Sequence, residues 1–62
     1  MFDAVKVFSA TKHKDRDELG ETITRWLEGM KDRITIVDKV ITQSSDSEYH
    51  CITITIFWNW KT

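Results

Sequence analysis

The chain has 62 residues, of which 31% are charged, with a formal net charge of −1, no proline and one cysteine. A chain of this length forms one domain, residues 1–62, and it buries too little surface to be more than marginally stable alone. The single cysteine, Cys51, excludes an internal disulfide, and no spacing of cysteines and histidines indicates a zinc site. With disulfides and zinc excluded, oligomerisation is the remaining way in which so small a domain is usually stabilised.

The balance of nine basic against ten acidic residues argues against binding to nucleic-acid phosphates or to an anionic membrane surface. No apolar run is long enough to span a bilayer. The start, Met1-Phe2-Asp3, lacks the basic and apolar regions of a signal peptide, and a lone cysteine without such a signal fits a reducing compartment. We therefore expect a cytoplasmic protein with no nucleic-acid and no membrane partner.

Residues 2–10 alternate in the manner of a β-strand. Val5 and Val7 fall on one face of this strand, and Phe2 and Phe8 fall on the other.

Residues 15–30 are expected to form a helix, which Asp15 would cap together with Glu18 in a variant of the capping box; Thr11 is an alternative start. Gly20 lies inside this helix, and we expect it to allow close packing against a sheet. The apolar residues recur at spacings of three, four and seven, which places on one face Leu19, Ile23, Trp26, Leu27 and Met30.

Residues 34–43 are rich in β-branched residues and predict a second strand, 44–48 predict a polar turn, and 49–60 predict a third strand. The expected fold class is α+β in the order β-α-β-β, with one helix packed on a three-stranded, mainly antiparallel sheet. One arrangement open to these strands places the third between the first two, antiparallel to both, although the residue pattern does not fix the strand order.

One helix can cover only one face of such a sheet. We expect the covered face to hold Val5, Val7 and the isoleucines 52, 54 and 56. The second strand is apolar on both sides, so large apolar groups remain on the uncovered face, which a monomer rarely exposes. We therefore expect a homo-oligomer whose interface is formed by Phe2, Phe8, Val37, Ile41, Tyr49 and Phe57.

The element order at this length resembles the dodecins, small flavin-binding proteins whose subunits assemble into a shell. The resemblance implies a homo-oligomer and a flavin or another small aromatic ligand. The tryptophan on which the dodecins stack flavin lies on their second strand, whereas residues 34–43 of this chain contain no aromatic residue. No ligand residue is therefore carried over from that family.

The loop after the first strand offers a candidate anion site, because Lys12, His13, Lys14 and Arg16 surround the expected start of the helix. A solvated surface loop is the alternative, since acidic side chains in the first turn already complement the helix dipole. His13 and His50 lack any metal-ligand spacing, and we expect no metal.

Trp58 and Trp60 share one face of the third strand and could stack a flat ligand, although core or interface packing is the alternative. Two other classes of function stay open. One is an interaction module that offers the third strand to another protein. The other is an enzyme whose site is shared between subunits and uses His13, His50 or Cys51.

Overall fold

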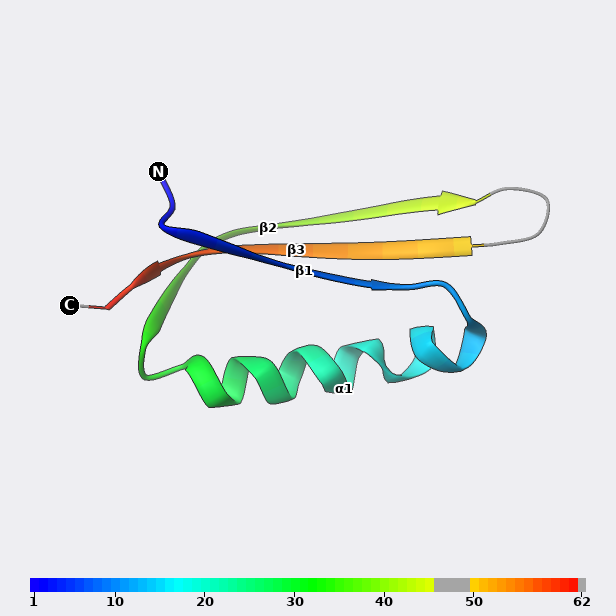
Figure 1. The fold of residues 1–62 in the computed structure, drawn as a ribbon, viewed down its shortest axis with the longest axis horizontal. Helices are drawn as coiled ribbons and strands as arrows, with labels where there is room; N and C mark the ends of the chain where they lie inside the picture. Colours follow the sequence, from blue (N-terminus) through cyan, green and yellow to red (C-terminus); the bar gives the residue numbers. More distant parts are fainter. Residues whose placement is uncertain (46–49, 62) are drawn as a thin grey trace.

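The computed structural model describes residues 1–45 and 50–61. The chain runs through β1 (Ala4–Ala10), α1 (His13–Met30), β2 (Ile34–Ser45) and β3 (His50–Trp60). The strands form one sheet in the order β1-β3-β2, and β3 pairs antiparallel with both neighbours (Figure 1). The α+β class and the β-α-β-β order are therefore confirmed, and the third strand takes the central position.

The helix begins earlier than the sequence indicates, at His13, and its N-cap is Lys12, which makes no capping hydrogen bond through its side chain. Asp15 lies in the first turn, so the expected capping box does not form; the carboxylate still lies where the helix dipole favours an anion. Gly20 is exposed, and no atom lies within 4 Å of the place a β-carbon would take. The expectation that Gly20 serves close packing is wrong.

The core lies between α1 and the sheet. It consists of Leu19 and Ile23 from the helix and of five buried strand residues, Phe8, Ala10, Ile34, Ile56 and Trp58. Trp26 bridges the two layers, because its ring lies 5.6 Å from that of Phe8 and 5.0 Å from that of Trp58. The apolar face of the helix is thus the one that the residue spacing predicts.

The face that β1 turns towards the helix is the opposite of the one expected. Phe8 and Ala10 are buried under α1, whereas Val5 and Val7 are exposed on the other face. The pattern alone could not settle this point, because both faces of β1 carry apolar side chains. The isoleucines of β3 do lie on the helix side, as Ile56 is buried and Ile52 and Ile54 pack against the core.

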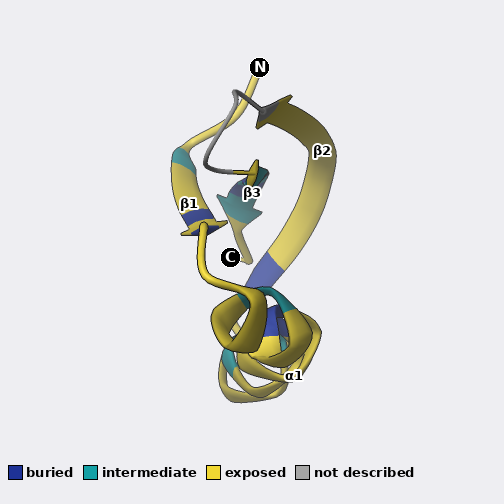
Figure 2. Ribbon diagram, turned by 90° about the vertical axis from the view of Figure 1, so that its right-hand side faces the viewer, coloured by how far each residue is buried: buried dark blue, intermediate teal, exposed yellow. Residues whose placement is uncertain are grey.

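The strand β2 contains an irregularity at Ile36/Asp38, where its register with β3 shifts. A bulge of this kind inserts one residue, here Val37, and reverses the alternation for the residues that follow. Beyond its buried start at Ile34, β2 is exposed along its described length, and it curves away from α1 (Figure 2). The helix therefore covers β1 and β3 rather than the whole sheet.

Candidate functional site

The sheet has one face that α1 does not reach, called the open face here. Paired residues of antiparallel strands share a face, so the register places thirteen strand residues on it. They are Val5, Val7 and Ser9 of β1, Thr35, Asp38, Val40, Thr42 and Ser44 of β2, and Cys51, Thr53, Thr55, Phe57 and Asn59 of β3.

Only one of these thirteen side chains, Asp38, carries a charge, in a chain of which 31% is charged. The sheet lysines lie on the other face, since Lys6 and Lys39 both pair with the buried Ile56. When one face of an antiparallel sheet is in water, residues alternate along each strand, so that polar and charged side chains point to the water. The open face is polar at many positions but carries almost no charge, and its larger apolar side chains are grouped, because Val5 pairs with Phe57 and Val7 and Val40 both pair with Thr55.

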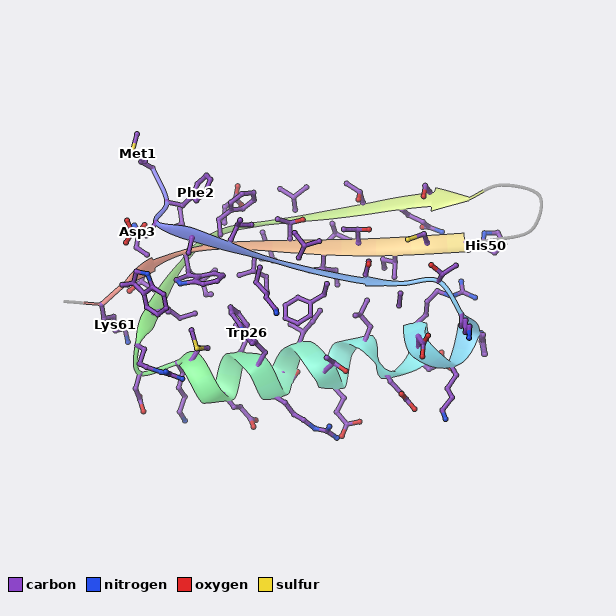
Figure 3. The ribbon with its side chains drawn as sticks, viewed as in Figure 1. Met1, Phe2, Asp3, Trp26, His50 and Lys61 are labelled. Atoms are coloured by element: carbon purple, nitrogen blue, oxygen red, sulfur yellow. The ribbon has the colours of Figure 1, made fainter. Side chains whose placement is uncertain are left out.

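The apolar character of the open face is greatest where the chain begins. Phe2 packs against Phe57 with ring centroids 4.7 Å apart. Together with Met1, Val37 and Asp38, these rings line a hollow of about 180 Å³. Figure 3 shows Met1 and Phe2 on the side of the sheet away from α1. Backbone and side-chain hydrogen bonds of Asp3 to Trp58 and Trp60 attach this N-terminal segment to β3.

The structure separates the six residues expected in an oligomer interface. Phe2, Val37 and Phe57 lie together around the hollow. Phe8 is buried under α1, so its expected place on the uncovered face is wrong. Ile41 pairs with Ile54 and therefore lies on the helix side of β2, because the bulge reverses the alternation. Tyr49 lies outside the described residues.

The sequence reasoning missed Val5, Val7 and Val40 as members of the uncovered apolar surface. All three are exposed on the open face. One signal in the sequence could have indicated the orientation of β1. Lys6 shares the face of Phe8, and its ammonium group lies 5.6 Å above that ring, where a long side chain covers a core residue while its charge stays in water.

The isolated chain exposes more surface than a compact protein of its size. Its accessible surface is 4860 Å². A folded monomer of 7.3 kDa is expected to expose about 4200 Å². The radius of gyration is 13.2 Å, whereas about 10.6 Å is expected for 62 residues. The excess of roughly 700 Å² approaches the area that each partner loses in a protein–protein interface of standard size.

The four residues of the candidate anion site differ in their surroundings. Lys12, His13 and Lys14 are exposed, and the imidazole of His13 lies 3.3 Å from the carboxylate of Asp17. Arg16 is half-buried, and it lines a hollow of about 140 Å³ with Gln43, His50, Cys51 and Ile52. The loop at the start of α1 therefore has the character of a solvated surface.

The two tryptophans of the candidate ligand site lie at the opposite end of the sheet. Trp58 and Trp60 pack edge to face with centroids 5.9 Å apart, which confirms that they share a face. Trp58 is buried in the core, and its indole N–H finds no hydrogen-bond partner among the described residues. Trp60, which pairs with Ile34, is half exposed. The tryptophans and the loop cations therefore cannot form one site.

Among the residues that the structure describes, the candidate catalytic residues form no nucleophile–base pair. The thiol of Cys51 lies 3.9 Å from the hydroxyl of Thr53 and 4.0 Å from the carbonyl oxygen of Ile52. Within residues 1–45 and 50–61, no three histidine, cysteine, aspartate or glutamate side chains gather to hold a metal ion. No helix in this part of the chain has the length and apolar character needed to cross a membrane.

The comparisons with known proteins give no relative for this chain. No protein-family model, no curated protein and no solved structure matches it.

Proposed function

We propose that this protein acts as the subunit of a homo-oligomer in which a second copy covers the open face of the sheet. The observation that carries the proposal is the near absence of charge from this face. The thirteen described strand positions include one carboxylate, Asp38, and the apolar end contains the Phe2–Phe57 pair. Burying such a surface requires the desolvation of almost no charge, and it yields roughly 25 cal/mol for each Å² of apolar surface removed from water.

A second copy suits this surface for two reasons. The excess surface of the isolated chain is close to one side of a standard interface, and a two-fold axis would bury the same area on both copies. The net charge of −1 adds almost no long-range repulsion between copies. The hydroxyl groups of Thr53 and Thr55, on the central strand, could pair with those of the second copy, so burial would not leave them unsatisfied.

Native mass spectrometry at micromolar concentration tests the proposal by comparing the wild type with Val7→Lys. Val7 is 57% exposed on the open face, so a lysine there leaves the core of the subunit intact. In the assembly, the same lysine would place a charge inside an apolar interface. We expect the wild type to be oligomeric and the variant to form an assembly with fewer subunits.

Thr24→Lys is the matched control, because it adds the same charge to an exposed position on α1, away from the open face. This variant should keep the mass of the wild-type assembly. A wild-type protein that is monodisperse at 7.3 kDa would contradict the proposal.

The proposal also includes a cytoplasmic location and a small aromatic ligand. The free thiol of Cys51 supports a reducing compartment. Of the three tryptophans, Trp60 is the one with an exposed ring on which a flavin could stack. Flavin absorbance in the purified protein, and its loss in Trp60→Ala, test this part; a colourless wild type that binds no added flavin would refute it.

A further inference from the structure

The strand β2 is unusual for the edge of a sheet. It has twelve residues, and β3 occupies only one of its two edges. Apolar side chains are exposed on both of its faces, with Ile41 (59%) on the helix side and Val40 (44%) on the open face. Strands with apolar side chains on both faces normally have both faces covered by packing. In the isolated chain β2 lies at the edge of the sheet, and its apolar side chains are exposed on both faces.

The two edges of the sheet differ in their protection against pairing. One edge of the sheet is formed by β1, which has seven residues and carries Lys6 near its middle. Short edge strands and lysines are the usual means by which proteins prevent pairing between sheets. The charges of β2, Asp38 and Lys39, lie at the bulge, and the segment Val40–Ser44 that follows has no charge, no proline and no glycine.

The helix does not cover this segment. Both ribbon views show β2 leaving α1 after its first residues (Figures 1 and 2). Val40–Ser44 are all exposed, and Arg16 is the helix residue that lines a hollow with this segment, at Gln43. A second copy of the same strand could pair with the vacant edge without repulsion between charges. Antiparallel self-pairing about a two-fold axis within this segment brings no like charges opposite one another, because none are present.

We propose that Val40–Ser44 of β2 pairs antiparallel with the same segment of a second copy, which joins two three-stranded sheets into one continuous sheet. This inference rests on the proposed homo-oligomer and deepens it by naming a second interface besides the open face. Two different two-fold interfaces on one subunit propagate the assembly beyond a dimer. Such an assembly closes with dihedral symmetry, as a tetramer or a larger species with an even number of subunits.

Native mass spectrometry of four proteins tests this inference: the wild type, Val7→Lys, Ile41→Lys and the double variant. Ile41→Lys changes an exposed side chain, and in the paired strands it places two lysines close to each other. We expect a tetramer or larger species for the wild type, a dimer for each single variant and a monomer for the double variant. Ile41→Thr, which keeps a β-branched side chain without the charge, should retain the wild-type mass.

Hydrogen exchange separates strand pairing from side-chain packing at the same place. In β2, alternate backbone N–H groups point towards β3 and away from it. In the wild-type assembly we expect slow exchange also for the outward-pointing N–H groups of Val40–Ser44. In the Ile41→Lys variant, the exchange rate of these groups should be at least tenfold higher.

The two proposals fail in different ways. A wild-type dimer that Val7→Lys dissociates and Ile41→Lys leaves intact would overturn the β2 pairing and leave the open-face interface standing. An assembly that Ile41→Lys dissociates and Val7→Lys does not would overturn the open-face proposal. Fast exchange of every outward-pointing N–H group of Val40–Ser44 in the wild-type assembly would also overturn the pairing.

Discussion

The indole ring of Trp26 on α1 lies edge to face against that of Trp58 on β3, with centroids 5.0 Å apart and an interplanar angle of 60°. The ring of Phe8 on β1 meets Trp26 at 5.6 Å. One side chain of the helix therefore contacts two strands of the sheet. In a protein whose described core has seven buried residues, this aromatic cluster is a large part of what holds the helix in place.

Trp26→Ala should destabilise the protein by about 3 kcal/mol, which is near the low end of the range for core aromatics because Trp26 is half-buried. Trp26→Phe should cost less, since it keeps an aromatic contact with Phe8 and Trp58. Chemical denaturation followed by circular dichroism measures both changes. Arg25→Ala is the neighbouring control, because it removes only an exposed pair with Glu21 and should cost less than about 1 kcal/mol. Equal losses for the Trp26→Ala and Arg25→Ala variants would contradict the anchoring role.

Gly20→Ala should stabilise the protein by about 1 kcal/mol, because alanine has the higher helix propensity and its β-carbon meets no atom within 4 Å. For a domain of this size, such a gain raises the melting temperature by roughly 4–8 °C. Thermal denaturation at fixed protein concentration measures it. Gly29→Ala is the companion variant, since Gly29 lies one residue from the end of α1, where propensity counts for less. A loss of stability in Gly20→Ala would mean that Gly20 is packed against another surface.

Much of the fold follows from the residue pattern, for reasons that particular elements make clear. The apolar spacing of Leu19, Ile23 and Trp26 marks one face of a helix, and that face is the buried one. The alternation of β3 is strict, so its helix-side isoleucines could be identified. The short connection between β2 and β3 indicates an antiparallel pair, and the sheet order β1-β3-β2 is the arrangement that places the third strand in the centre.

The errors arise where the pattern is symmetric or interrupted. Both faces of β1 carry apolar side chains, so only the packing against α1 decides that Phe8 is buried and Val7 exposed. The bulge near Val37 inserts a residue that no turn signal marks, and it moves Ile41 to the helix side. Phe2 and Phe57 lie on the uncovered face as expected, whereas Val5 and Val7 were expected under the helix, and the position of Lys6 beside Phe8 is the sequence signal that indicates otherwise.

The orientation of β1 predicts opposite behaviour for two neighbouring residues. Phe8→Ala should lower the free energy of unfolding by about 3 kcal/mol at every protein concentration, because it leaves a cavity inside the subunit. Val7→Ala should act mainly through association, so its effect on the melting temperature should shrink as the protein is diluted. Thermal denaturation over a hundredfold range of concentration distinguishes the two. A concentration-independent loss for Val7→Ala as large as that of Phe8→Ala would show that Val7 faces the core.

Cys51 provides a chemical probe of the open face. Its thiol is free and half-buried in the isolated subunit, and it lies on the same face as Val7 and Thr53. A copy that covers this face would shield the thiol further, so alkylation by iodoacetamide should be at least fivefold slower in the wild type than in Val7→Lys. Mass spectrometry of the quenched reaction measures the rate, and unfolded wild type and variant should react alike. Equal rates in the two folded proteins would place Cys51, and with it the hairpin end of the open face, outside the interface.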